Sequence, residues 1–484
     1  MAQLAYDRPH TPHENNGEEE DYPNRIANYS KALPHDNLGE VDPAAYDALL
    51  GALASGDKAD FEAIPMGLGR TLTNPQAGLA FDLQGPDAWH LAIRPHPRID
   101  SAEHSGEAAE LYWMSLLRDV EFTGFDTDRM VAQAAREMSR FSDFRGPKEG
   151  AEVTPKTIFR GITPGDVTGP YVSQFMLKDI QYGSLAISHR QQTVVGGIDY
   201  LTDFDSWLNA QNGGRSGPVR LDPVPRYIRN MRDLTHYVHV DALYEAYLNA
   251  CLILLGMGAP FDPGNPYVHS GNQHGFGTYG GPHILSLVTE VATRALKAVW
   301  YQKWFVHRRM RPEEFGGRVH VHKSGRASYP INAELLGTEA LDLVRRRHGT
   351  WLLPQAYPEG APTHPSYGAG HATVAGACVT ILKAWFDESF VIPDPVVPNP
   401  AGRALAPYTG PDAGALTVGG ELNKVAANIA SARNMAAIHW RTDYSESIKL
   451  GEEVAIGILE EQKASYNEGG SFTLTRFDGT TITI

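Results

Sequence analysis

Hydrophobic residues recur at intervals of three and four positions along most of this chain, which is the spacing of amphipathic helices. The longest such run extends from Ile284 to Met310, and we predict one continuous helix that Pro312 terminates. A run that begins near Asn230, a suitable N-cap residue, predicts a helix that ends near Gly256. The same spacing predicts further helices at 42–53, 101–122, 126–141, 335–347, 371–387, 420–438 and 443–463.

Alternation of the strand type is clear at the C-terminal end, SFTLTRFDGTTITI, where Asp478 and Gly479 are typical of the turn in a β-hairpin. No sequence repeat is apparent along the chain. The predicted fold is therefore mainly α, with one or more helical bundles, a few short strands and a C-terminal β-hairpin.

The first 40 residues are polar, acidic and interrupted by proline, so we predict an extended N-terminal arm over 1–40 rather than part of the core. Such an arm can be disordered or can wrap a neighbouring subunit. A chain of 484 residues is long enough for a large core, and one big helical domain or two packed bundles are both permitted.

The net charge of −15 argues against a nucleic-acid partner, because proteins that bind the phosphate backbone usually carry a basic face. Cys251 and Cys378 lie in apolar runs, which indicates buried thiols and no disulfide framework. No apolar stretch follows a basic start, and no segment approaches about 18 uninterrupted apolar residues. The expectation is a soluble protein without a secretory signal, cytoplasmic by default and not bound to a membrane.

Three short stretches carry the residues with the greatest chemical interest. The first, KWFVHRRMR, places Lys303 and Arg311 eight positions apart, which is about 80° around a helix, so both cations can lie near one side. A histidine between them, His307, would be mostly neutral near pH 7 and adds no dependable charge. Taken alone, this stretch also fits an ordinary solvated helix end.

The second stretch, HPSYGAGH, contains a glycine-rich turn at 368–370 that leads directly into a predicted helix. The free N–H groups and the positive dipole end of that helix would face an anion. His371 stands at the helix entry, where it can donate or accept a proton near neutral pH, and His364 lies seven residues earlier. A glycine hinge with a capping histidine is the simpler alternative for this stretch.

The third stretch, SARNMAAIH, adds Arg433 and His439, and Asp443 follows four residues after the histidine. Asp443 can accept a hydrogen bond from one ring nitrogen of His439 and thereby raise the basicity of the other, as happens for metal-binding or nucleophilic imidazoles. A histidine and an aspartate at this spacing can also be a simple surface pair. Cations, imidazoles and a helix entry in one chain together favour a site for a tetrahedral oxyanion.

The three stretches resemble the signatures of the vanadium-dependent haloperoxidases, and in particular those of the algal and cyanobacterial bromoperoxidase branch. The resemblance is dense from about Tyr279 to Gly451, and GPYVSQFMLKDIQYGS at 169–184 is also similar. It implies a single large α-helical domain over 41–484 with the active site in 280–451. It also implies a homo-oligomer, either a dimer or a larger closed assembly.

The resemblance also assigns roles to residues of the site. His439 would bind vanadium, and Lys303, Arg311, Arg433 and the Gly370 N–H would hold the oxygens of vanadate. His371 would act as acid and base, while His364 and Trp300 would lie near the halide. The implied reaction is the activation of hydrogen peroxide on vanadium, followed by attack of bromide or iodide to give hypohalous acid, which halogenates a small organic acceptor.

One position departs from the family pattern: most members carry serine before the Gly–His pair, whereas this chain carries Ala369. One hydroxyl donor to the oxyanion is therefore missing. Two other functions remain open, namely an acid phosphatase of the same superfamily that acts through a phospho-histidine, and a non-catalytic oligomeric oxyanion-binding protein. The Lys-to-Arg spacing, which is one residue longer than in those phosphatases, and the presence of His364 and Ala369 favour the peroxidase.

A long loop at 261–279 is rich in glycine, asparagine and other oxygen-bearing side chains. Loops of this length in a compact fold are often functional, and oxygen ligands suit calcium. We therefore expect that this loop can bind a structural calcium ion, in addition to the vanadate cofactor of the site.

Overall fold

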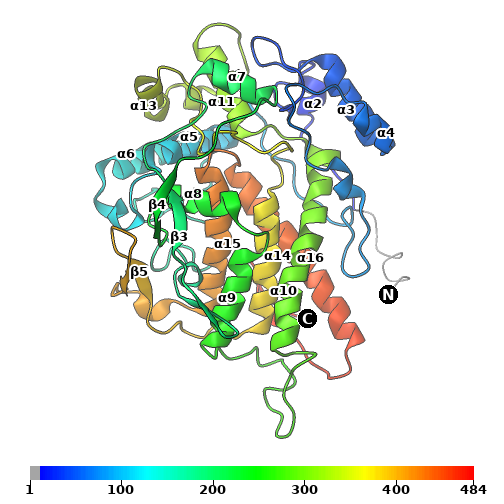
Figure 1. Ribbon diagram of the computed structural model, residues 1–484, viewed down its shortest axis with the longest axis vertical. Coiled ribbons are helices and arrows are strands. Elements are labelled where there is room, and N and C mark those ends of the chain that lie inside the picture. Colours follow the sequence, from blue (N-terminus) through cyan, green and yellow to red (C-terminus); the bar gives the residue numbers. More distant parts are fainter. Residues whose placement is uncertain (1–10) are drawn as a thin grey trace.

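A computed structural model describes residues 11–484 of the chain (Figure 1). Long helices run through the middle of the molecule, most of them roughly along its long axis (Figure 1): α9 (Glu245–Gly256), α10 (Gly281–Tyr301), α14 (Gly370–Trp385), α15 (Val418–Met435) and α16 (Arg441–Ser465). Helix α14 packs against α10, α15 and α16. All but one of its residues are buried, as expected for a helix that carries small or apolar residues on every side.

Shorter helices complete the helical part of the described residues. The longer of these are α3 (Pro43–Ser55), α5 (Ala102–Leu117), α6 (Arg129–Met138), α7 (Phe204–Gln211), α8 (Met231–Val240), α11 (Pro312–Lys323) and α13 (Glu339–His348). The shortest elements are α2 (Glu18–Asp21), α4 (Lys58–Glu62), α12 (Ala333–Leu336) and the 3₁₀-helices η1 (Pro75–Leu79), η2 (Phe122–Thr127), η3 (Gln174–Met176) and η5 (Ala413–Ala415). The side chain of Asp42 caps α3 and that of Asn230 caps α8.

The strands form four separate antiparallel pairs. These pairs are β1 (Ile180–Tyr182) with β2 (Leu185–Ile187), β3 (Gln191–Val194) with β4 (Leu221–Arg226), β5 (Val396–Pro398) with β6 (Leu405–Pro407), and β7 (Thr473–Thr475) with β8 (Thr481–Thr483). The last pair is the predicted C-terminal hairpin, and Gly479 adopts the positive φ of 87° that its turn requires. The prediction of a mainly α fold with short strands is confirmed.

The prediction of one helix from Ile284 to Met310 is wrong. Helix α10 ends at Tyr301 and continues as a π-helical turn, η4 (Gln302–His307), after which Arg308 has a positive φ of 41°. Pro312 does not terminate a helix; it occupies the first turn of α11, where its missing N–H costs nothing, and Glu314 caps that helix. The chain therefore leaves α-helical geometry between Lys303 and Arg311, and the spacing along a single helix does not relate these two residues.

The helix predicted from Asn230 to Gly256 is also interrupted. Helix α8 ends at Val240, and α9 begins at Glu245 after a bend of 102° between the two axes. The periodicity of hydrophobic residues continues through this break because both helices are buried against the same core. The bend places Asp241 at the end of α8, where it contacts the site described below.

The predicted arm over 1–40 is only partly tested, because residues 1–10 lie outside the described part of the chain. Beyond them, residues 26–33 are buried, which contradicts the expectation that this region stays out of the core. The polar side chains found partners there: Lys31 is fully buried and forms an ion pair with Glu313 at 2.7 Å. Residues 26–33 are therefore buried although the first 40 residues are polar in composition.

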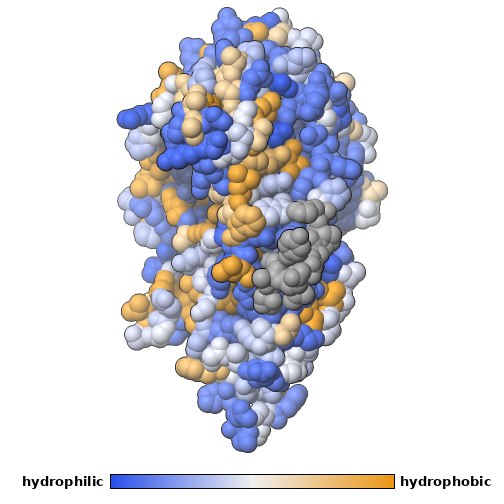
Figure 2. Space-filling view, turned by 90° about the vertical axis from the view of Figure 1, so that its right-hand side faces the viewer, coloured by the Kyte–Doolittle hydropathy of each residue, from blue (hydrophilic) through white to orange (hydrophobic). Residues whose placement is uncertain are grey.

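Both cysteines are buried and free, as predicted. Among the described residues, no single helix is long and apolar enough to cross a membrane, although the bent pair α8 and α9 would qualify by length and composition. Hydrophobic side chains gather across the middle of the face that lies at the right of Figure 1 (Figure 2). Several large hydrophobic residues of the segment 66–91 remain exposed, namely Leu68, Leu79, Phe81 and Leu83.

Candidate active site

The three stretches singled out in the sequence meet in the interior of the molecule. Lys303 comes from the π-helical turn, and Arg311 from the residue before α11. The loop before α14 contributes His364, and the loop between α15 and α16 contributes His439. Contacts between the stretches are direct: Arg311 donates to His364 and to His439 at 2.9 and 2.8 Å.

Lys303 is fully buried, and its Nζ donates to the backbone carbonyls of Pro365 and Ser366 at 2.8 and 2.9 Å. The ammonium also lies 5.7 Å from the ring centre of Trp300. Burial, and then the charge of Arg311, lower the pKa of Lys303 well below its usual value. An anion bound beside this group would reverse that effect and keep the lysine charged.

Arg311 is fully buried as well, and burial lowers its pKa to about 10. Its N–H groups point to the carbonyls of His364 and Ile438 and to the rings of His364 and His439. All of these partners are neutral or weakly basic acceptors. The guanidinium charge is therefore not balanced by any group to which it donates.

Arg433 lies in the last turn of α15 and donates to the Val238 carbonyl at 2.7 Å. Its Nε has no hydrogen-bond partner among the residues that the structure describes. Within residues 11–484, none of Lys303, Arg311 and Arg433 forms a salt bridge with a carboxylate. Buried cations that lack a counter-ion are costly, so this arrangement is typical of a site that receives an anion.

The His439–Asp443 pair has the geometry expected from the sequence. His439 Nδ1 lies 2.8 Å from Asp443 Oδ2, and both residues are buried. A guanidinium has only donors, so the contact from Arg311 requires Nε2 to be the unprotonated nitrogen. The proton therefore lies on Nδ1, where it is donated to Asp443, and the lone pair of Nε2 is available to an electrophile.

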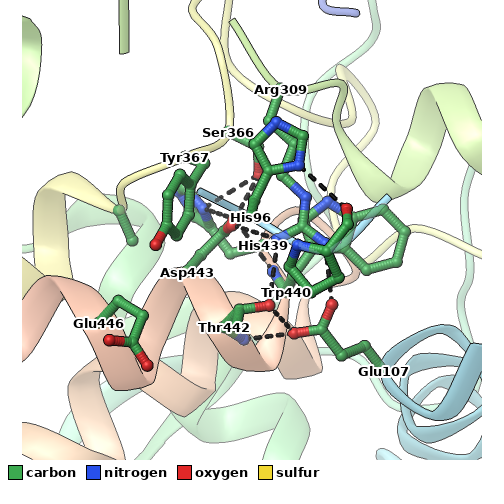
Figure 3. Close-up of polar contacts among 12 residues, drawn as sticks. His96, Glu107, Arg309, Ser366, Tyr367, His439, Trp440, Thr442, Asp443 and Glu446 are labelled. Carbon is green, nitrogen blue, oxygen red and sulfur yellow. Dashed lines mark hydrogen bonds and ion pairs between the residues drawn. The ribbon is translucent and has the colours of Figure 1, made fainter. Parts of the chain in front are cut away.

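Several buried partners of Asp443 were not identified from the sequence. Its Oδ1 accepts from Arg309 at 2.9 Å, and its Oδ2 accepts from Ser366 Oγ as well as from His439. Glu107 on α5 accepts in turn from Arg309 at 2.8 Å (Figure 3). Arg309 and Ser366 lie within the stretches already recognised, but no sequence pattern relates Glu107, some 200 positions away, to them.

The turn before α14 brings Gly370 and Ala369 to the helix entry. The first N–H groups of α14 have no carbonyl partner within the helix and point out of its end. No side chain caps this helix, because Ala369 occupies the N-cap position. The Ala369 N–H itself donates to Ser447 Oγ of α16 at 2.8 Å, so a hydroxyl from another helix holds the turn.

His364 and Trp300 lie against each other, with ring centres 4.8 Å apart. Burial, and then the charges of Arg311 and Lys303, lower the pKa of His364 well below its usual value. His371, in contrast, contacts a carboxylate: its Nε2 lies 3.1 Å from Asp241 Oδ1. Asp241 is a further residue that the sequence did not reveal, because it follows a helix break that was not predicted.

His307 is buried, and neither ring nitrogen has a hydrogen-bond partner among the described residues. Burial, and then the charge of Arg308, lower its pKa from 6.5 to about 3, which agrees with the neutral state expected from the sequence. The unfolded chain takes up this proton near pH 6.5, whereas the folded protein remains neutral until about pH 3. Stability is therefore lost as the pH falls through this window.

We expect His307→Phe to reduce this acid sensitivity. Between pH 6.5 and 5, the free energy of unfolding of the variant should fall by about 1.5 kcal/mol less than that of the wild type, because no imidazole is left to titrate. Urea unfolding at the two pH values measures the difference. His274→Gln, in an exposed loop, is the control and should follow the wild type. An unchanged pH dependence in the His307 variant would contradict this interpretation.

The chain is similar to a known family model and to several known proteins. Residues 284–468 match the family model of the VCPO second helical-bundle domain. The vanadium-dependent bromoperoxidase of Corallina pilulifera is 40% identical over 578 positions, which cover 100% of this chain and 96% of that protein. The vanadium-dependent bromoperoxidase of Ascophyllum nodosum is 36% identical, over 97% of this chain and 87% of that protein.

The fold was also compared with solved structures. The homohexameric second vanadate-dependent bromoperoxidase from Ascophyllum nodosum superposes with a TM-score of 0.94. The alignment covers 100% of this chain and 88% of that chain, at 31% sequence identity. The similarity therefore extends over the whole of the chain and is not confined to the three stretches.

Proposed function

This chain belongs to the vanadium-dependent haloperoxidase family, and we propose that it uses hydrogen peroxide to oxidise bromide and iodide to hypohalous acid, which halogenates organic compounds. The observation that carries this proposal is the group of three buried cations without a carboxylate partner, beside a histidine whose Nε2 carries no proton. This donor set suits orthovanadate, because its oxygens need cationic donors and its metal needs one nitrogen ligand.

In this proposal, His439 Nε2 is the vanadium ligand, and Asp443 fixes the proton on the other ring nitrogen. Lys303, Arg311 and Arg433 neutralise the oxygens, together with the Gly370 N–H at the entry of α14. When bound, vanadate supplies the Lewis-acid centre on which hydrogen peroxide becomes reactive toward halide.

Other residues of the chain handle protons and the halide. His371, oriented by its contact with Asp241, takes up or releases a proton beside the oxyanion. His364 and Trp300 lie against each other beside the Lys303 ammonium, and we assign the halide to this place.

The rival function is phosphate ester hydrolysis through His439, because vanadate and phosphate fit the same donors. An assay with bromide, hydrogen peroxide and orthovanadate, run beside one for phosphomonoester release, separates the two functions. We expect oxidation of bromide that depends on vanadate, and no phosphomonoesterase activity in the vanadate-free protein. Ester hydrolysis without bromide oxidation would favour the phosphatase, and vanadate binding without either activity would favour a non-catalytic protein.

We expect Ala369→Ser to tighten vanadate binding or to speed bromide oxidation. A hydroxyl at this helix entry can donate to the oxyanion, and such a bond to a charged group contributes about 1.5–3 kcal/mol, or about tenfold to a hundredfold. A water molecule that already fills this position would reduce the gain. Paired measurements of vanadate affinity and turnover test the prediction.

The same hydroxyl has an alternative partner. As an N-cap residue, serine would accept from a backbone N–H of α14, which lacks a side-chain cap, and raise the free energy of unfolding by about 1 kcal/mol. Higher stability with unchanged vanadate affinity and unchanged turnover would mean that position 369 does not face the oxyanion.

We expect bromide and iodide to be oxidised with little turnover of chloride. Chloride is the hardest of the three halides to oxidise, and His364 stands where the chloroperoxidases of the family carry phenylalanine. Rates measured with one organic acceptor and each halide in turn test this expectation. Chlorination as fast as bromination would contradict the role given to His364 and Trp300.

We further propose that the chain forms a homo-oligomer, as its hexameric structural relative does. The exposed hydrophobic residues of the segment 66–91 are available for such contacts.

The calcium ion expected in the loop 261–279 stays a prediction. No group of three or more histidine, cysteine or carboxylate residues suited to a metal ion occurs among the described residues, so its ligands would have to come largely from carbonyl and amide oxygens.

A further inference from the structure

Two buried residues behind the His439–Asp443 pair form a network that none of the proposed roles above uses. Arg309 is 1% exposed and Glu107 is 4% exposed. Figure 3 shows both side chains in one series of polar contacts that leads to Asp443 and His439. They come from different parts of the fold, since Glu107 lies on α5 and Arg309 on the segment between η4 and α11.

The N–H groups of Arg309 are divided between two carboxylates. One terminal nitrogen donates to Asp443 Oδ1 at 2.9 Å and to Thr442 Oγ1 at 3.2 Å. The other donates to Glu107 Oε2 at 2.8 Å and lies 3.1 Å from His104 Nδ1. The guanidinium also stacks on Trp440, 4.9 Å from the centre of its ring. The position of this cation is therefore fixed from several sides.

Both carboxylate oxygens of Glu107 also accept hydrogen bonds. Its Oε2 accepts from Arg309, and its Oε1 accepts from both the backbone N–H and the hydroxyl of Thr442. Thr442 directly precedes Asp443 at the start of α16. Glu107 therefore holds both the cation that contacts Asp443 and the backbone that carries Asp443.

The two carboxylate oxygens of Asp443 accept hydrogen bonds from different partners. Arg309 occupies Oδ1, which leaves Oδ2 to accept from His439 Nδ1, from Ser366 Oγ and from the Trp440 N–H. If Arg309 were absent, Oδ1 would be a buried acceptor without its cation, and the carboxylate could rotate away from the ring. Only the contact from Arg311 would then hold the proton of His439 on Nδ1, without the carboxylate that accepts this proton.

We propose that Arg309, held in place by Glu107, is a positioning residue for the vanadium-binding histidine, because it fixes the Asp443 carboxylate that keeps the proton of His439 on Nδ1. This inference rests on the proposed function. Neither Arg309 nor Glu107 is expected to contact vanadate, peroxide or halide.

The chain offers a matched control for Glu107. Glu110, one turn further along α5, is also fully buried and forms an ion pair with Arg441, so it too bridges α5 and α16. It makes no contact with Asp443 or Arg309. Glu107→Gln and Glu110→Gln each remove one buried carboxylate between the same two helices, and they differ in whether the His439 network is touched. Arg309→Lys is the complementary variant, because one ammonium cannot reproduce the fork that serves two carboxylates.

Two measurements decide the inference. The first is the vanadate dissociation constant, measured by equilibrium dialysis. The second is the ¹⁵N spectrum of histidine-labelled protein without vanadate, in which the His439 signals are those missing from His439→Gln. We expect Glu107→Gln and Arg309→Lys to weaken vanadate binding by about tenfold to a hundredfold. Their His439 signals should move from a single tautomer toward a mixture, whereas Glu110→Gln should match the wild type in both measurements.

Equal losses in Glu107→Gln and Glu110→Gln would reduce the network to a structural role and overturn the inference, as would wild-type affinity in Glu107→Gln. Failure of the proposed function is a different result, because the wild-type protein itself would then not bind vanadate. The ¹⁵N measurement needs no vanadate, so it tests the positioning of His439 even in that case.

Discussion

His439→Ala is expected to abolish vanadate binding and, with it, bromide oxidation. Among the described residues, His439 is the only histidine of the site whose Nε2 faces buried cations while its Nδ1 is held by a carboxylate. Removal of this ring takes away the nitrogen that we propose as the vanadium ligand, so that the remaining cations would hold an oxyanion by charge alone. We expect the affinity to fall by at least about a hundredfold.

The control for this variant is His283→Ala, which removes a histidine from the first turn of α10. His283 is far from the site, because Trp300, which lies near the site on the same helix, is 17 residues and about 25 Å along the helix axis from His283. The control should bind vanadate as the wild type does. Tight vanadate binding by His439→Ala would reject the ligand assignment.

Asp443→Asn is expected to have the second-largest effect. The amide can present a donor to His439 Nδ1, which would move the ring proton to Nε2 and block the nitrogen that should bind vanadium. A comparable exchange behind a catalytic histidine costs about 10⁴-fold in turnover in serine proteases. We expect a loss of vanadate affinity of about a hundredfold, measured by equilibrium dialysis.

Asp233→Asn is the matched control, because Asp233 is also buried and ion-paired, to Arg229 at 2.8 Å, but lies outside the site. Melting temperatures of both variants show whether either exchange unfolds the protein. A folded Asp443→Asn variant with unchanged affinity would mean that the tautomer of His439 does not depend on this carboxylate.

The three stretches were recognisable in the sequence because their chemistry is concentrated in short motifs. Lys303 and Arg311 share one motif, and His439 and Asp443 are four residues apart, so local spacing is enough to identify them as candidates. The family resemblance supplied their roles. The structure adds that these residues are buried and in contact, a property that no single stretch can reveal.

The sequence did not predict how Lys303 and Arg311 are brought together. The hydrophobic periodicity continues through η4 because the π-helical turn keeps Trp304 and Val306 buried, so the departure from α-helical geometry leaves little trace in the pattern. Pro312 is compatible with both the end and the beginning of a helix. In the structure, the Glu314 carboxylate accepts from the Arg311 N–H, and this capping contact marks the beginning of α11.

Glu107 and Asp241 were missed for a different reason. Each contacts the site only through long-range packing, Glu107 through the contact of α5 with Arg309 and Asp241 through the bend between α8 and α9. A buried glutamate has no local sequence pattern that distinguishes it from an exposed one. Only tertiary structure shows that its partner is an arginine of the site.

Dependence of bromide oxidation on vanadate is tested by a titration of vanadate-free protein with orthovanadate, in which bound vanadium and the rate of bromide oxidation are measured on the same samples. Dialysis against phosphate and a chelator at mildly acid pH should first remove both the metal and the activity, because phosphate competes for one oxyanion site. Activity should return in proportion to bound vanadium and saturate at one vanadium per chain. Bromide oxidation that is independent of vanadate, or that requires haem or flavin, would refute the proposed function.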